Sequence, residues 1–280
     1  PMVLGFGCTV PAIMATRALE TEHDRRRTMI VTPFMSCSAR LPIYVLFSEM
    51  FFPQCAMLVA FSMYVIGMVM GILVALVQHK LEKGKVNQSL MIELPEYKRP
   101  NARTIRTYVW NKLKDYLTKA GTTIFIASII IWFILNFGGK GMVADPSESF
   151  GAALGRLLVP VLKPAGLGLW QIAVALISGI SAKEVVVSSF SVLFGVSNAN
   201  SAAGMASIIE NIRQFDPSFG GLNAFCLMLF CLLYVPCVAT IATIRKESGS
   251  WKFTSAVMVF QIGLAWLVSV LVFQIGSFFL

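Results

Sequence analysis

Apolar residues fill most of the chain in seven long runs that are separated by polar stretches. A helix needs about 20 apolar residues to cross the hydrocarbon core of a bilayer. The predicted spans cover residues 1–19, 29–52, 55–77, 121–137, 170–194, 222–244 and 253–279, and residues 197–221 are predicted to be a loop. Hydrophobic residues make up 56% of the 280 positions and charged residues only 13%. The pattern predicts an all-α, polytopic transmembrane helical bundle, multi-pass in a lipid bilayer.

Two of these runs contain a cysteine close to a proline. Cys8 stands in the segment 7–11 (GCTVP), and Cys237 stands in the segment 234–240 (YVPCVAT). A proline inside a helix leaves the carbonyl four residues earlier without its usual donor. Pro11 and Pro236 therefore predict interrupted helices, and in a membrane the freed carbonyls must be satisfied by protein, water or an ion. A thiol beside a freed carbonyl suits a soft or borderline cation.

Charge distribution predicts the orientation of the spans. Residues 79–119 carry ten Lys and Arg against four acids, which indicates a cytoplasmic loop. Its second half is amphipathic and predicts a helix on the membrane surface. Counting seven crossings places Arg25–Arg27 inside but the basic stretch 245–252 outside, against the usual rule; a re-entrant fifth run would move that stretch inside.

The same count predicts that the helices with Cys8 and Cys237 run in opposite directions. Interrupted helices in opposite orientation are typical of inverted repeats that meet at a substrate site near the membrane midplane. Whether the two cysteine segments form one site is the question that this pattern raises.

Charged residues deep in predicted spans are costly and mark functional candidates. Arg40, Lys183 and Glu184 lie beside helix interruptions, whereas Glu49 is near the end of its span. An ion pair between Arg40 and Glu184 is the structural alternative. The candidate metal ligands are Cys8, Cys37, Cys237 and Glu184. The candidate pathway or structural residues are Ser36, Ser38, Arg40, Ser181, Lys183, Pro11 and Pro236, and the serines have backbone hydrogen bonding as their alternative role.

Other classes of function find little support. The net charge of +9 is spread over loops in the way the positive-inside tendency predicts, so we expect no nucleic-acid partner. The sequence contains two histidines and no GxxxxGK[ST] motif, which leaves no basis for an enzyme. Cys55, Cys226 and Cys231 are interpreted as packing residues.

Several motifs together resemble the membrane region of the bacterial ferrous-iron transporter B (FeoB) family. They cover residues 5–11, 15–17, 32–42, 93–97, 119–122, 181–188 and 233–240. The resemblance implies import of Fe²⁺ across the bacterial inner membrane, with Cys8 and Cys237 in the metal pathway. It also implies GTP hydrolysis with Mg²⁺ by an N-terminal G domain that this chain lacks, and small cytoplasmic accessory proteins. Assembly into a homo-oligomer stays open.

The resemblance divides the chain into three parts. Residues 1–78 would hold the end of a first gate repeat and the helices after it. Residues 79–119 would form the cytoplasmic basic loop with its amphipathic helix. Residues 120–280 would hold the second gate repeat, with an external segment near 138–168. On this reading the chain is the C-terminal part of a longer protein's membrane domain.

Two other functions remain as alternatives. Gate-type repeats also resemble those of carriers for organic solutes such as nucleosides, and a membrane scaffold could use the basic loop to dock partners. A solute carrier should line its broken helices with Asn, Gln, Asp and aromatic side chains. The interruptions here offer Cys, Ser and a single Glu, which favours a metal ion.

Overall fold

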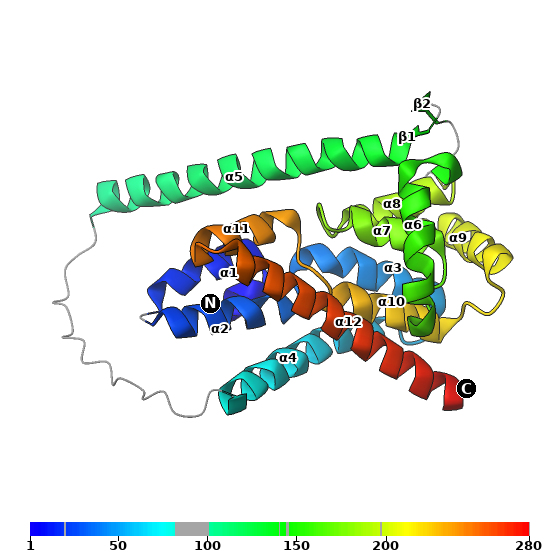
Figure 1. Cartoon of the computed structure of the whole chain (residues 1–280), viewed down its shortest axis with the longest axis horizontal. Coiled ribbons are helices and arrows are strands. Elements are labelled where there is room, and N and C mark those ends of the chain that lie inside the picture. The colour runs from blue at the N-terminus through cyan, green and yellow to red at the C-terminus, as the bar shows by residue number, and fades with distance from the viewer. Residues whose placement is uncertain (20, 82–100, 140, 144–145, 197, 280) are drawn as a thin grey trace.

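The computed structural model describes residues 1–19, 21–81, 101–139, 141–143, 146–196 and 198–279 (Figure 1). Helices form nearly all of the regular structure in these ranges. The exception is a small antiparallel pair, β1 (Phe137–Gly138) with β2 (Gly141–Met142). The prediction of an all-α helical membrane bundle is therefore confirmed.

The first 81 residues form short helices followed by one long one. In order they are η1 (Val3–Phe6), α1 (Thr9–Met14), η2 (Ala15–Ala18), α2 (Glu22–Val31), η3 (Thr32–Phe34), η4 (Ser38–Arg40), α3 (Leu41–Phe51) and α4 (Ala56–Leu81). The chain is broken between η1 and α1 and again around η4, where prolines and small polar residues gather. These are the interruptions that the sequence predicts.

The remainder is also a series of broken helices. It contains α5 (Ala102–Asn136), η5 (Pro146–Glu148), α6 (Phe150–Leu162), η6 (Lys163–Ala165), α7 (Trp170–Ser178), α8 (Val185–Leu193), α9 (Ala202–Phe215), α10 (Gly221–Leu233), α11 (Val238–Ser248) and α12 (Trp251–Phe279). Helix α9 occupies the stretch predicted to be a loop. Ser201 starts it by accepting a hydrogen bond from the backbone N–H of Gly204 at 3.0 Å, a capping signal that the polar composition hid.

Fewer segments than seven are long and apolar enough to cross a membrane. Within the described ranges they are Glu22–Phe51, Ala56–Leu81, Gly221–Ser248 and Trp251–Phe279, with α6 and α7 as a fifth if this pair, bent by 103°, counts as one span. The first run is a set of short helices. The fifth run is also not a single crossing, because α7 and α8 have nine residues each and pack against each other. The chain thus folds back at 179–184, which is the re-entrant arrangement.

Helix α5 differs from the prediction as well. The predicted surface helix and the predicted fourth span are one helix of 35 residues, Ala102–Asn136. Asn101 caps its start by accepting from the backbone N–H of Arg103 at 3.0 Å, and no proline follows before its end. The prediction of a separate helix for the second half of the loop is therefore wrong. Figure 1 shows α5 along one edge of the molecule, and residues 82–100 of the predicted loop lie outside the described residues.

The core is built around α10, whose side chains from Cys226 to Leu233 are all buried. Helices α3, α4 and α12 pack around it. Helices α4 and α12 expose large apolar side chains on their other faces, as lipid-facing helices do. Gly67 and Gly71 are buried on the inner face of α4 and meet Phe34 and Met35, so the helix packs closely at this pair.

Helices α1 and α11 run in the same direction, which corrects the predicted opposite orientation. They pack against each other, and Cys8 and Cys237 stand at their starts. Their far ends also meet, because Arg17 donates from Nε to a carboxylate oxygen of Glu247 at 2.6 Å. The crossing count failed because it took the first and fifth runs as complete crossings. The stretch 245–252 consequently lies at the same end of the bundle as Arg25, whose guanidinium lies 3.9 Å from Glu247.

Candidate functional site

Four breaks in the helices converge on one cavity of about 250 Å³. They separate η1 from α1, η3 from α3, α7 from α8, and α10 from α11. The lining residues come from all four breaks: Gly7, Cys8, Thr9, Val10, Cys37, Ser38, Ala39, Arg40, Ser181, Ala182, Lys183, Glu184, Pro236, Cys237, Ala239 and Thr240. The structure thus brings Cys8 and Cys237 to one cavity, which answers the question that the paired motifs left open.

Each of the four candidate metal ligands occupies the position just before a helix. Cys8 precedes α1, Cys37 precedes η4, Glu184 precedes α8, and Cys237 precedes α11. The three cysteines have extended backbone, and none uses its thiol to cap the helix that follows. This local geometry explains why they point their side chains to the break. The thiol of Cys237 lies 3.2 Å from the hydroxyl of Thr240, which the candidate list missed although it belongs to the 234–240 motif.

The first two breaks are joined by a serine. The carbonyl of Gly7 accepts from Ser38 Oγ at 2.9 Å and from its backbone N–H at 3.3 Å. Gly7 therefore has the predicted non-helical carbonyl, and protein satisfies it. The cause differs from the prediction, because α1 begins only at Thr9 and Pro11 lies in its first turn, where a missing N–H costs nothing. Pro11 is exposed and does not line the cavity.

The other two breaks are joined by two contacts. The N–H of Val238 donates to the carbonyl of Ile180 at 2.7 Å, and Lys183 Nζ donates to the carbonyl of Val235 at 2.6 Å. The predicted interruption at Pro236 is present, but the proline lies outside both helices. Helix α10 ends at Leu233, so Pro236 lies between two helices and the carbonyl left to a side chain is that of Val235.

Lys183 also packs on an aromatic ring. Its Nζ lies 3.2 Å from the centroid of Tyr234, close enough for a cation–π interaction. The Tyr234 hydroxyl donates to the carbonyl of Leu176 at 3.2 Å and so ties α10 to α7. Tyr234 supports the cavity through Lys183 and was not among the candidate residues, although it opens the 234–240 motif.

Arg40 is 1% exposed and is held by backbone rather than by an acid. Its two terminal nitrogens donate to the carbonyls of Met35 and Pro33, each at 3.1 Å. The alternative of an ion pair with Glu184 is therefore wrong in this structure, and Glu184 is exposed. Positive charge thus lines the wall of the cavity beside the three cysteines.

Two of the three candidate serines, Ser38 and Ser181, follow their alternative role of backbone hydrogen bonding. Ser36 lies outside the cavity and donates to the hydroxyl of Tyr44 at 3.1 Å. Ser38 and Ser181 line the cavity but donate to the carbonyls of Gly7 and Ser178. Within the described part of the chain, no three His, Cys, Asp or Glu side chains are grouped closely enough to hold a metal ion together. The candidate ligands share a cavity without forming a closed cage.

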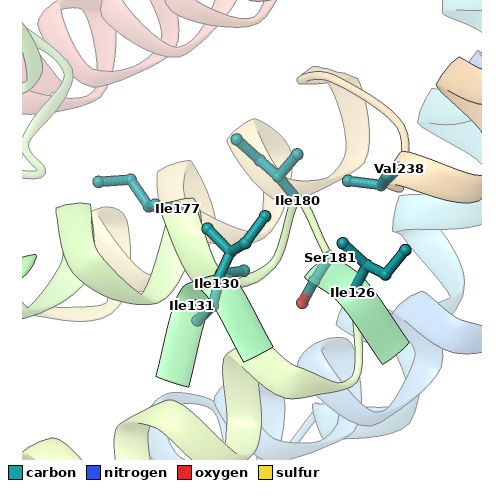
Figure 2. A pocket seen from close by; sticks show the side chains of 7 residues that line it. All are labelled: Ile126, Ile130, Ile131, Ile177, Ile180, Ser181 and Val238. Carbon is teal, nitrogen blue, oxygen red and sulfur yellow. The ribbon is translucent and has the colours of Figure 1, made fainter. Parts of the chain in front are cut away.

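A second cavity, of about 430 Å³, lies on the other side of Ser181. Figure 2 shows its lining, which is aliphatic apart from that serine: Ile126, Ile130, Ile131, Ile177, Ile180, Ser181 and Val238. It lies between α5 and the start of the fold-back at 179–184. Ser181 belongs to both linings, so the polar cavity and the apolar cavity share this residue.

Comparisons with known proteins agree with these motifs. A family model named Gate and described as "Nucleoside recognition" matches residues 1–51 and 117–251, and the model "Ferrous iron transport protein B C terminus" matches residues 60–112. The chain is 40% identical over 279 residues to an Fe(2+) transporter FeoB of Staphylococcus aureus, covering 100% of this chain and 40% of that protein.

More distant relatives carry related names. An Fe(2+) transporter FeoB of Methanocaldococcus jannaschii is 37% identical over 99% of this chain and 41% of its own length. A Porphyromonas gingivalis protein named "Fe(2+) transport protein A/Fe(2+) transporter FeoB fusion protein" is 35% identical over 100% of this chain and 38% of its own length. No solved structure gives a significant match. The chain, which spans about 40% of the length of these relatives, belongs to the Gate family and to the C-terminal membrane part of the FeoB family.

Proposed function

We propose that this chain is the membrane permease portion of a ferrous-iron uptake transporter and moves Fe²⁺ into the bacterial cytoplasm. The observation that carries the proposal is the convergence of Cys8, Cys37 and Cys237, from three distant parts of the sequence, on one cavity at four helix breaks. Fe²⁺ is a borderline cation that accepts thiolate, carboxylate and carbonyl ligands. The printed names of the relatives support the same ion.

The open arrangement of the ligands suits transport better than storage. A conducting site must bind its ion weakly enough to release it. The three thiols and the carboxylate of Glu184 line the cavity without a closed cage, so an ion would meet few protein ligands at a time and keep water around it. Cys8, Cys37, Cys237 and Glu184 are the proposed ligands.

The direction of transport follows from the basic end of the bundle. Arg17, Arg25, Arg245 and Lys246 gather there, on α11 and on the segments beside α1. The positive-inside tendency assigns this end to the cytoplasm. An ion leaving the cavity between α1 and α11 would then move toward the cytoplasm.

Energy coupling belongs to the longer protein in this proposal. GTP hydrolysis with Mg²⁺ would take place in a G domain elsewhere in that protein, and a small cytoplasmic protein would assist. The name of the Porphyromonas gingivalis relative, which joins an Fe(2+) transport protein A to the transporter, supports such a helper. Assembly of several copies is a further part of the proposal.

A nucleoside carrier is the second candidate, favoured by the description of the Gate family model. The cavity argues against it. Cys, Ser, Thr and small apolar residues line it together with Arg40, Lys183 and Glu184, and its lining includes no amide or aromatic side chain from the described residues. A nucleoside base needs such groups for stacking and hydrogen bonding.

Uptake of radioactive Fe²⁺ tests the proposal. The full-length gene is expressed in cells that lack their own ferrous-iron uptake, and Mn²⁺, Zn²⁺ and a nucleoside are added as competitors. We expect uptake of Fe²⁺ that the nucleoside does not inhibit. Nucleoside uptake without Fe²⁺ uptake would establish the second candidate instead.

A further inference from the structure

Two buried basic side chains line the cavity without an acidic partner among the described residues. Arg40 is 1% exposed and Lys183 is 2% exposed. All the contacts described above go to neutral groups, namely backbone carbonyls and the Tyr234 ring. Within the described residues neither side chain forms an ion pair, and Nε of Arg40 has no hydrogen-bond partner although it is buried. A buried guanidinium stays protonated, and buried charge without compensation is strongly unfavourable, so Arg40 calls for an anion.

The remaining groups around the cavity do not supply that charge by an evident contact. Glu184 is the one carboxylate in the lining, and it is exposed. The other titratable groups in the lining are the thiols of Cys8, Cys37 and Cys237. The starts of α8 and α11, with nine and eleven residues, face the cavity and add further positive potential from their backbone N–H groups. The cavity thus has an excess of hydrogen-bond donors and positive charge.

We propose that the cavity binds a small inorganic anion of the halide class between Arg40 and Lys183. The free Nε–H of Arg40 is its charged donor, Lys183 belongs to the same lining, and a cavity of about 250 Å³ admits such an ion with water. This inference does not rest on iron as the transported ion. It implies, however, that a divalent cation entering the cavity meets an anion that offsets the buried positive charge of Arg40.

Ionised cysteines are the competing source of negative charge. If the thiols of Cys8, Cys37 and Cys237 were thiolates, they would neutralise Arg40 without a bound ion. The two explanations differ in one measurable respect. A bound anion is exchangeable, whereas a thiolate is part of the protein.

Direct binding of radioactive chloride to the purified full-length protein is the first test. We expect saturable binding that bromide displaces, lost in Arg40→Gln and retained in Arg40→Lys. Arg156→Gln is the matched control, because Arg156 also donates to a carbonyl, that of Ser147, but is exposed and far from the cavity. Saturable binding that persists unchanged in Arg40→Gln, or no saturable binding to the wild type, would overturn the proposal.

Thiol labelling tests the same point without altering Arg40, in case Arg40→Gln does not fold. Two variants are compared, one keeping Cys237 and one keeping Cys55 as the single cysteine; Cys55 is exposed and outside this cavity. At Cys237 an anionic methanethiosulfonate should react about tenfold faster than a cationic one, given the charges nearby. Replacing gluconate by chloride should slow the anionic reagent at Cys237 and leave Cys55 unchanged.

The labelling outcomes separate the two explanations. Faster anionic labelling that chloride slows supports the anion site. A preference for the cationic reagent, or an anionic preference that chloride leaves untouched, overturns it. Uptake of Fe²⁺ does not enter either test, so failure of the anion site leaves the proposed transport function standing.

Discussion

Arg17 and Glu247 lie 230 positions apart in the sequence and form a two-point ion pair that joins the ends of α1 and α11. The Glu247 side chain is 3% exposed, whereas that of Arg17 is 44% exposed. Arg25 approaches the same glutamate at 3.9 Å. The pair therefore holds together two segments from opposite ends of the chain.

Removing one partner of this pair should destabilise the protein. Arg17→Gln leaves the buried carboxylate of Glu247 with only the more distant Arg25, and we expect a loss of roughly 1–2 kcal/mol, between the values typical of exposed and buried pairs. The midpoint of thermal unfolding of the purified full-length protein measures it. Arg26→Gln is the matched control, since its partner Glu22 is exposed and the change should have almost no effect. Equal shifts in the two variants would contradict a special role for Arg17.

The ring of Tyr234 should contribute more to the stability of the protein than its hydroxyl does. Tyr234→Phe keeps the ring beneath Lys183 and loses only the hydrogen bond to Leu176, at a cost of about 1 kcal/mol. Tyr234→Leu also removes the cation–π contact and leaves a poorly filled space, so the loss should be larger. Thermal unfolding of both variants measures the difference, and a larger loss in Tyr234→Phe would show that the hydroxyl dominates.

The cavity cysteines should matter for transport and not for folding. Cys8→Ser and Cys237→Ser should each lower Fe²⁺ uptake several-fold at normal protein levels in the membrane, because a hydroxyl is a poor ligand for a borderline cation. Cys55→Ser changes an exposed thiol outside the cavity and should leave uptake unchanged. Wild-type uptake by the double variant of Cys8 and Cys237 would remove their role as ligands.

Close packing of α4 predicts an asymmetric response to alanine. A Cβ on Gly67 would lie 2.8 Å from the carbonyl oxygen of Phe34 and 3.2 Å from Leu232, so Gly67→Ala should cost about 1–3 kcal/mol. Gly263→Ala in α12 is the control, because no atom lies within 4 Å of its added Cβ. We expect the control to be neutral or slightly stabilising. Unfolding midpoints compare the two, and equal values would show that the contact with Phe34 adjusts freely.

The shared direction of α1 and α11 predicts a particular topology. On a background without cysteine, His23→Cys and Ser250→Cys should react with a membrane-impermeant maleimide only from the cytoplasmic side, because both lie at the basic end. Ser277→Cys, near the other end of α12, should react only from outside. Labelling of Ser250→Cys from outside would restore the opposite orientation that seven crossings predict.

Much of the site could be predicted from sequence because its residues are unusual for a membrane span. A cysteine near a proline indicates the breaks at Cys8 and Cys237. A charged residue near a serine indicates the breaks at Arg40 and Lys183. Their meeting at one cavity follows from the cost of leaving broken backbone unsatisfied in a membrane. The individual partners could not be predicted. Nothing in the sequence indicates that Lys183 donates to the carbonyl of Val235, since any freed carbonyl would serve.

The topology was harder to predict because length and hydrophobicity do not distinguish a crossing from a fold-back. The run 170–194 is apolar enough to span, yet it forms two short helices that pack together. The basic stretch 245–252 was the one conflict in the seven-span count, and the structure places it at the same end of the bundle as Arg25. The sequence pattern predicts two separate helices for α5 because the composition changes from amphipathic to apolar midway. The backbone nevertheless stays helical throughout.

Helices α1 and α11 are fastened to each other at both ends, by the cavity wall at their starts and by Arg17 and Glu247 at their far ends. Contacts at both ends hold the two helices at a fixed position relative to each other. A displacement of the basic end would therefore move the segments that carry Cys8 and Cys237 together, as one unit.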